Sequence, residues 1–481
     1  MLFNSFSFVI FYISVVIIYF WLNHKKRNFF LLLSSYFFYL SFNVKYGLLL
    51  LAATLITYFS AILMKNVKNK KLLVTLCVIL NVSFLFIFKY LNFSISIINS
   101  LLPNINNSTS FSLWNIILPI GISFFIFQAL GYVIDVYRDK VKAETNFVDF
   151  ALFVSFFPQL LSGPIGRSNQ LLPQLKTIKQ FNYNNAKDGI QLIIWGVFKK
   201  IVIANRLAIY VDKIYNNLDY FGTYEIMFAT ILFAFQIYCD FSGYSDIAVG
   251  TAKIMGFDLI RNFKRPYTAN SISDFWHRWH ISLSSWLKDY VYISLGGSRV
   301  SKFRHRLNLL LTFLISGIWH GANWTYIIWG VIHGIAVVAD SLNPFNLKDK
   351  ITIRLRKLLT FIFVCFAWIF FRANTISDAI LAVNKLFINQ SEFNLYNYRR
   401  FITGIDFVTF NNVVTHSIIN SLTIVSIVLF IVAQLIMKDI EIDSYFNENK
   451  KNRRIVFNTI ISILILFCGV FDNTQFIYFK F

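Results

Sequence analysis

Long apolar runs alternate with short polar or basic stretches along the whole chain. The first run, Leu2–Leu22, is long enough to cross a bilayer and is followed by the basic cluster His24–Arg27. A cleavable signal peptide would instead begin with positive charge and end in small residues. We therefore predict that this helix is retained and that the N-terminus lies outside, since basic clusters stay on the cytoplasmic side.

The other apolar runs predict further membrane spans. The basic cluster Lys65–Lys71 and the charged loop Asp135–Lys142 should be cytoplasmic, whereas the uncharged polar stretch Ser94–Ser112 should form an external loop. With the first helix, these runs predict an all-α polytopic membrane protein of about eleven transmembrane helices. The runs are Phe29–Phe42, Tyr46–Met64, Leu72–Phe88, Trp114–Ile134, Leu192–Ile209, Tyr224–Asp240, Leu307–Ile318, Trp324–Val338, Leu358–Phe371, Ile418–Met437 and Ile455–Val470.

The pattern breaks down between Phe150 and Gln191. Pro158, Pro164 and two glycines interrupt an apolar sequence there. Broken backbone at membrane depth is tolerated only where protein or a water-filled cavity surrounds it, so we predict a re-entrant element. The amphipathic segment Trp286–Leu295 should lie along the membrane interface. We find no sign of a soluble domain and treat residues 1–481 as one integral-membrane domain.

Composition supports the membrane assignment. The chain is 57% hydrophobic and only 14% charged, and its 481 residues contain only 7 prolines and 19 glycines. The net charge of +22 could indicate nucleic-acid binding. However, the basic residues occur in short clusters between apolar runs, and no soluble basic face is available for phosphate contacts. Four cysteines are scattered singly without metal-ligand spacing, and we expect them to pack in the core.

Histidines in two tryptophan-flanked segments carry the candidate chemistry. His320 lies in Ser316–Trp324, and His277 and His280 lie in Asp274–Ser282. An ionisable residue at membrane depth is costly and therefore indicates a functional site. His277 and His280 are three residues apart and would share one helix face. They could supply two metal or haem ligands, but no third ligand appears at a recognisable spacing.

Acid–base chemistry explains more of the pattern. Histidine, with a pKa near 6.5 in its ordinary state, suits a general base working near neutral pH. Gly317 and Gly321 around His320 would leave room for a substrate to approach closely. A purely structural role is the simpler interpretation for His277 and for three other histidines, namely His24, His305 and His416. No GxSxG or SxxK motif supports a serine nucleophile.

Nearly the whole chain resembles the membrane-bound O-acyltransferase family, and most closely its branch of alginate and peptidoglycan O-acetyltransferases. The segments that carry the resemblance are FFPQLLSGPIGR (Phe156–Arg167), CDFSGYSDIAVG (Cys239–Gly250), NFKRPY (Asn262–Tyr267), DFWHRWHISLSSWLKDYVYISLGGSR (Asp274–Arg299), SGIWHGANW (Ser316–Trp324), WIFFRA (Trp368–Ala373) and QFIYFKF (Gln475–Phe481). The teichoic acid D-alanyl transferases of the same family share the RWH and WHG elements.

The resemblance implies a ring of helices around a thin central region, with a cytoplasmic funnel for the acyl donor. The family histidine of WHG corresponds to His320 and that of RWH to His280, so His320 would be the base and His280 its partner in one site. Many relatives carry Arg or Asn at the position of His277. The usual donor is acetyl-CoA, and no metal is implied. Arg278 could pair with the donor phosphates, although an interfacial arginine would look the same, and we expect Trp279 and Asn323 to complete the donor site.

By this resemblance the chain would lie in a bacterial inner membrane. It would pass acetyl groups outward, to a secreted or membrane-anchored esterase-like partner that modifies a polysaccharide. Transfer of D-alanine or another acyl group to a surface polymer is the first alternative. The second alternative is a transporter that moves an acyl carrier without catalysing transfer, but we find none of the inverted repeats typical of transporters.

The last residues suggest a relay. The basic cluster Lys450–Arg454 should be cytoplasmic and Ile455–Val470 is barely long enough to cross, so the tail Phe471–Phe481 should emerge outside. An aromatic anchor in the membrane interface is one interpretation. The other draws on resemblance to the partner protein of D-alanyl transfer, which ends in a similar tyrosine-containing tail. On that interpretation Tyr478 would lose its proton toward His320, accept the acetyl group and pass it on.

Overall fold

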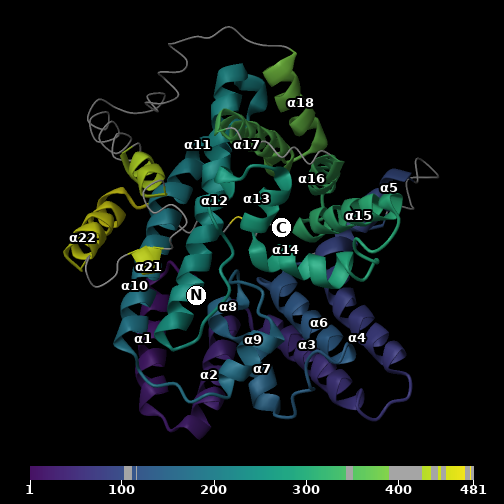
Figure 1. The fold of residues 1–481 in the computed structure, drawn as a ribbon, viewed down its shortest axis with the longest axis vertical. Coiled ribbons are helices and arrows are strands. Elements are labelled where there is room, and N and C mark those ends of the chain that lie inside the picture. Colours follow the sequence, from purple (N-terminus) through teal and green to yellow (C-terminus); the bar gives the residue numbers. More distant parts are fainter. Residues whose placement is uncertain are drawn as a thin grey trace.

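Helices form all the regular structure in the described part of the chain. The computed structural model (Figure 1) describes residues 1–101, 111–114, 116–342, 350–388, 425–434, 442–445, 451–471 and 477. The helix α12 (Thr223–Ile254) runs through the middle of the view, and the N-terminal helices gather below it. An all-helical, strongly apolar architecture is what the hydrophobic pattern predicted.

Within the residues that the structure describes, four helices are long and apolar enough to cross a membrane. They are α3 (Val44–Leu63), the continuous helix Lys70–Leu101, α12 and α16 (Trp324–Leu342). Three shorter apolar helices cover Phe6–Trp21, Ile122–Tyr137 and Val425–Gln434. The count of about eleven spans and their ring arrangement stay predictions.

Most predicted runs coincide with helices, although the helices are often longer. Further α-helices of the described residues are α1 (Phe6–Trp21), α2 (His24–Leu40), α4 (Lys70–Leu85), α5 (Leu91–Leu101), α6 (Ile122–Tyr137), α7 (Phe147–Ser155), α8 (Phe157–Leu160), α9 (Ser168–Leu175), α10 (Tyr183–Val197), α11 (Asn205–Tyr215), α13 (Ile272–Arg278), α14 (Ile281–Leu287), α15 (Lys302–His320), α17 (Lys350–Arg372), α18 (Ile376–Phe387), α21 (Ile442–Tyr445) and α22 (Lys451–Cys468).

Two predicted boundaries around the external loop are wrong. The helix that begins at Lys70 continues to Leu101, well into the stretch predicted to be a loop, because its uncharged polar residues are compatible with helix. The next helix begins only at Ile122 rather than at Trp114. It starts after Gly121, whose φ of +77° favours glycine, and a Cβ there would lie 2.6 Å from the carbonyl oxygen of Leu160.

The region rich in proline and glycine is broken, as predicted. It consists of the short helices α7, α8 and α9, joined by turns in which Ser162 is fully buried, before the chain enters α10. The segment predicted to be amphipathic contains the end of α14 and a π-helical turn. The four cysteines are buried and free, which agrees with the expected role in packing.

The described part of the chain contains three π-helical segments, two of which lie between α-helices, whereas the third follows the end of α14. They are η1 (Phe86–Tyr90), η2 (Phe198–Ala204) and η5 (Lys288–Tyr292). Such segments widen a helix by one residue per turn and occur frequently at functional sites. Each of the three carries lysine: Lys89 in η1, Lys199 and Lys200 in η2, and Lys288 in η5.

Glycines let α10 and α12 approach closely. A Cβ on Gly196 would lie 2.6 Å from the carbonyl oxygen of Gly243, and a Cβ on Gly189 would lie 2.6 Å from that of Gly250. Membrane helices commonly carry small residues at their contacts, because small side chains let the two backbones approach closely. This close approach brings the lysines of η2 against the carboxylates of α12.

Candidate active site

His320 is the last residue of α15 and is almost completely buried. The helix ends there because Gly321 is extended, and the next helix, α16, starts after Asn323, whose side-chain oxygen accepts a hydrogen bond from the Thr325 N–H at 3.1 Å. Aromatic rings surround the imidazole: its centroid lies 4.9 Å from Trp319, 4.9 Å from Trp329 and 5.3 Å from Phe371. The helix continues two residues past the end of the predicted run Leu307–Ile318 and so includes His320.

The glycines beside His320 serve helix packing. A Cβ on Gly317 would lie 2.4 Å from the Tyr326 carbonyl oxygen, and one on Gly321 would lie 2.3 Å from the Tyr326 ring. The expectation that these glycines leave room for a substrate is therefore wrong, because α16 already fills that room. Their absent side chains allow α15 and α16 to pack closely around the histidine.

His280 lies outside any helix, in the left-handed conformation. The helix α13 ends at Arg278, and His280 has φ +44° and ψ +53° just before α14. A non-glycine residue in this conformation is uncommon and indicates a functional or strongly held position. Asn262 holds it: its carbonyl oxygen accepts the Ile281 N–H at 2.9 Å, and its Oδ1 accepts the Ser282 hydroxyl at 2.6 Å.

The prediction that His277 and His280 share one helix face is wrong, because α13 ends between them at Arg278. The kink at Trp279 sends the two side chains to different places. His277 is exposed and its Nδ1 lies 2.7 Å from the carbonyl oxygen of Ser273, whereas His280 is fully buried. The ring of His280 packs on Phe241 at 4.6 Å and on Phe124 at 6.3 Å.

Trp319 joins the two buried histidines. Its indole lies 5.9 Å from the His280 ring and 4.9 Å from the His320 ring. Trp329 connects His320 to His333 in the same way, since its ring lies 4.9 Å from each of these imidazoles. The structure therefore brings His280 and His320 into one buried aromatic cluster, although the two come from different motifs.

His333 belongs to the same cluster and has a clear partner. The Trp276 indole N–H donates to His333 Nδ1 at 3.2 Å, and the Trp329 ring lies 4.9 Å from the imidazole. An accepting Nδ1 places the proton of the neutral ring on Nε2. His333 lies in α16, the helix that follows the one ending at His320.

Lys89 is a site residue that sequence analysis missed. Its ammonium group donates to the carbonyl oxygen of Trp319 and lies 5.7 Å from the Trp319 ring, while the hydroxyl of its neighbour Tyr90 donates to the Ile318 carbonyl oxygen at 2.8 Å. Carbonyls in the last turn of a helix lack helical partners, so these two side chains cap α15 directly at His320. The signal in the sequence was a single lysine inside an apolar run.

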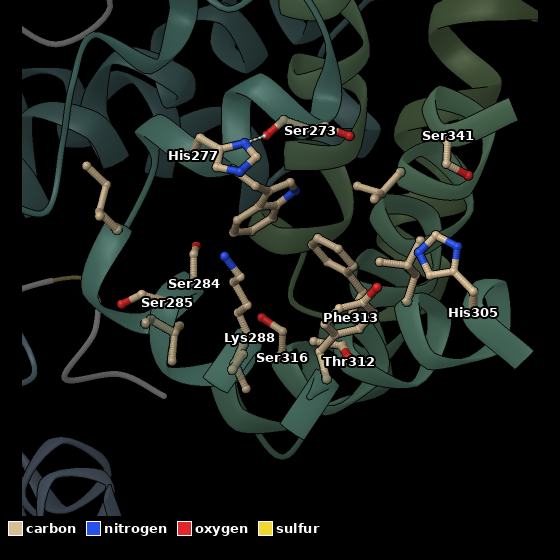
Figure 2. Close-up of a pocket in the computed structure, with 17 residues that line it drawn as sticks. Ser273, His277, Ser284, Ser285, Lys288, His305, Thr312, Phe313, Ser316 and Ser341 are labelled. Atoms are coloured by element: carbon tan, nitrogen blue, oxygen red, sulfur yellow. Dashed lines mark hydrogen bonds between the residues drawn. The ribbon is translucent and has the colours of Figure 1, made fainter. Parts of the chain in front are cut away.

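A cavity of about 420 Å³ lies along α15 and α16 beside this cluster (Figure 2). Its inner wall includes Trp276, Phe313 and Ser316, the last of which is one helical turn before His320. The buried hydroxyl of Ser316 has no hydrogen-bond partner among the described residues. Lys288 points into the cavity below His277, and His305 lines the opposite side, so basic side chains occur on both sides of a largely apolar cavity.

The predicted donor-binding residues are all engaged elsewhere. Arg278 pairs with Asp274 at 2.7 Å, and Trp279 is fully buried against Trp368 at 5.1 Å. The side-chain amide of Asn323 donates to the Asn374 carbonyl oxygen at 2.9 Å, between α16 and α18. None of the three belongs to the lining of the cavity in Figure 2. Their assignment as donor ligands stays a prediction.

Tyr478 lies outside the described residues, but its neighbour Ile477 lies within them. Ile477 is buried, and its backbone N–H donates to Asp240 Oδ2 of α12 at 2.8 Å. No group of three or more His, Cys, Asp or Glu residues that could hold a metal ion occurs in the part of the chain that the structure describes.

Comparison with known proteins agrees with the motifs. A model of the membrane-bound O-acyltransferase family matches residues 138–377, which include His280, His320 and His333. The chain is 41% identical to a probable alginate O-acetylase of Pseudomonas aeruginosa over 61% of its own length and 56% of that protein. It is 38% identical to a peptidoglycan O-acetyltransferase of Helicobacter pylori, over 71% of its own length and 70% of that protein.

A more distant relative is a teichoic acid D-alanyltransferase of Bacillus subtilis, at 30% identity over 53% of this chain and 69% of that protein. The chain spans less than two thirds of the length of the alginate O-acetylases that it matches. The chain belongs to the membrane-bound O-acyltransferase family.

Proposed function

We propose that this protein is a membrane O-acetyltransferase that moves acetyl groups from cytoplasmic acetyl-CoA across a bacterial inner membrane, for O-acetylation of an exported or cell-wall polysaccharide. The observation that carries the proposal is the burial of His320 and His280 around Trp319 in a chain of this family. The names of the relatives that are about 40% identical favour acetyl transfer to a polysaccharide.

The cavity beside α15 is the best candidate for the donor. An apolar slot of about 420 Å³ suits the pantetheine arm, and Lys288, with His277 above it, would meet the phosphates at one end. The unpartnered Ser316 hydroxyl offers a hydrogen bond near the inner end. Arg299 just before α15 and the basic residues Lys302 and Arg304 in its first turn support a cytoplasmic mouth.

In the proposed step, His320 acts as general base. It takes the proton of the accepting hydroxyl while that oxygen attacks the thioester carbonyl carbon. The carbon–sulfur bond then breaks, and the departing thiolate of coenzyme A receives the proton from the imidazolium. His280 orients His320 or contacts the thioester, and the aromatic walls exclude water that would hydrolyse the donor.

Tyr478 is the proposed first acceptor. Support comes from the position of Ile477, which is buried beside α12 although it lies at the end of the chain. A tyrosine hydroxyl, with an ordinary pKa near 10, needs a base such as His320 to become nucleophilic. The acetyl ester on Tyr478 would next pass to a secreted or membrane-anchored esterase-like partner, which would acetylate the polymer. A tail on the outer side of the membrane fits this sequence of steps, in which Tyr478 passes the acetyl group to a partner outside the cytoplasm.

Transfer of D-alanine is the second candidate. The similarity to the teichoic acid D-alanyltransferase of Bacillus subtilis favours it, but the identity of 30% is lower than the 38–41% found for the O-acetyltransferases above. The two candidates differ in the group released from the polymer by mild base, which would be acetate in one case and D-alanine in the other.

Tyr478→Phe tests the proposal directly, since it removes only the hydroxyl. We expect cells that carry this variant to lose polymer-bound acetate, measured after mild alkaline release, while the protein remains in the membrane at the parent level. The matched control is Tyr220→Phe, which removes a hydroxyl from a highly exposed side chain in the loop before α12. Full acetylation in Tyr478→Phe cells would contradict the relay and leave the tail as an aromatic anchor.

A further inference from the structure

Asp240 of α12 is a buried carboxylate that contacts two separate segments. Its Oδ1 lies 2.6 Å from the Lys200 ammonium group of η2, and its Oδ2 accepts the backbone N–H of Ile477 at 2.8 Å. The Asp240 and Lys200 side chains are only 3% and 2% exposed. A charge at this depth is stable only when it is paired and hydrogen-bonded, so the contact with the tail is part of the environment that Asp240 requires.

The chain is anchored to η2 just before the tail begins. At the end of α22, the Val470 N–H donates to the Ile201 carbonyl oxygen at 3.1 Å, and the Asn205 side chain donates to the Val470 carbonyl oxygen at 2.8 Å. Both partners lie in or next to η2, the segment that carries Lys200. The chain therefore leaves α22 against η2 and touches the same helix pair again at Ile477.

Asp240 also borders the histidine cluster. The next residue in α12 is Phe241, whose ring lies 4.6 Å from the His280 ring. On the other side of the contact, Tyr478 directly follows Ile477 in the sequence. The hydrogen bond to Asp240 thus fixes the backbone of the tail one residue before the proposed acceptor and next to a residue that packs on His280.

We propose that Asp240 is a positioning residue, a latch that holds the tail inside the protein through the Ile477 N–H, with Lys200 as its counter-charge. The latch would position the tail for the proposed relay, and its role in acetyl transfer rests on the proposal that Tyr478 is the first acceptor. Because the bond is to the backbone, it fixes where the tail lies without selecting the side chain at Ile477. The π-helical turn of η2 is what presents Lys200 to α12.

Two double variants distinguish loss of the hydrogen bond to the Ile477 N–H from loss of the ion pair between Lys200 and Asp240. Lys200→Met/Asp240→Leu removes both charges and the hydrogen-bond acceptor. Lys200→Met/Asp240→Asn removes both charges but keeps a carbonyl oxygen that can accept the N–H. Replacing a buried ion pair with uncharged residues of similar size often leaves a protein folded, so both variants should fold.

Accessibility of the tail is the measurement. In a background in which Cys77, Cys239, Cys365 and Cys468 are replaced by Ala, Ile477→Cys keeps the N–H and adds a thiol. The rate at which a membrane-impermeant maleimide labels this thiol in intact cells reports how often the tail leaves its site. We expect the Asp240→Leu pair to raise the rate about tenfold, because the N–H loses its acceptor, and the Asp240→Asn pair to raise it clearly less, because a neutral carbonyl oxygen keeps a weaker hydrogen bond.

Equal labelling rates for the two pairs would overturn the latch. The control is Lys199→Met/Asp246→Leu, which removes the neighbouring ion pair of 2.7 Å between the same two helices and should leave labelling unchanged. An increase with the control as large as with Asp240→Leu would also contradict the proposal. Faster labelling with full polymer acetylation would support the latch and count against the relay, so the two ideas can fail separately.

Discussion

The ammonium group of Lys89 donates a hydrogen bond to the carbonyl oxygen of Trp319, the residue before His320. A cation from η1 thereby caps the helix that ends at the candidate base. The cap satisfies a carbonyl that the helix itself leaves without a partner, and its positive charge faces the negative end of the helix dipole. Lys89, which lies outside the hairpin formed by α15 and α16, thus holds the end of α15 in place.

Lys89→Met should weaken this end of the helix. It keeps much of the length and apolar surface of the side chain but leaves the Trp319 carbonyl without its donor, which should lower the free energy of unfolding by about 1–3 kcal/mol. The transfer rate should fall as well, because His320 follows Trp319 directly. Thermal unfolding in detergent and an acetyl-transfer assay would measure the two effects.

Tyr90→Phe is the matched control for Lys89→Met, because it removes only the 2.8 Å bond to the Ile318 carbonyl oxygen. We expect a smaller loss of stability and a nearly normal rate. If Lys89→Met unfolds and reacts like the parent protein, the cap has no role in holding the histidine.

His320→Ala should abolish most transfer without unfolding the protein. Loss of a general base typically lowers a rate by about a hundredfold or more. Transfer of radiolabelled acetyl from acetyl-CoA in membrane vesicles would show the change. The control is His24→Ala, at an exposed position in the first turn of α2, which should leave the rate unchanged. A His320→Ala protein that transfers acetyl at the parent rate would exclude His320 as the base.

Lys288→Ala and Arg278→Gln decide where the donor phosphates bind. Lys288 points into the cavity along α15, whereas Arg278 is occupied by Asp274. We therefore expect Lys288→Ala to raise the KM for acetyl-CoA about tenfold with little change in kcat, because one charge-assisted hydrogen bond to phosphate is lost. Arg278→Gln should have a smaller effect on KM. A larger increase in KM with Arg278→Gln than with Lys288→Ala would instead support the donor site predicted from the sequence, at Arg278.

Gly317→Ala should destabilise the α15–α16 hairpin. Its new Cβ would lie 2.4 Å from the Tyr326 carbonyl oxygen, so the helices must separate, at a cost of about 1–3 kcal/mol in the free energy of unfolding. Gly334→Ala is the comparison, since the nearest atom to its Cβ would be the Phe313 Cβ at 3.2 Å, and alanine favours helix. Similar unfolding temperatures for the two variants would show that this hairpin is not tightly packed.

The hydrophobic pattern by itself determined the class of fold and the motifs that matter. Runs of apolar residues predicted helices because backbone groups in a membrane must bond within one segment, and His320 stood out because an ionisable side chain there is costly. Family motifs around His280 and His320 were also readable, since they consist of neighbouring residues. These features depend on local sequence alone.

Tertiary structure decided where helices stop and which distant residues meet. The left-handed turn at His280 depends on Asn262, and the cap on Trp319 depends on Lys89, both far away in the sequence. The π-helical turns that carry Lys89, Lys200 and Lys288 leave no recognisable periodicity, because each changes the helix by a single residue. Local sequence sets the helices, but partner contacts across the protein set these turns and hence the site.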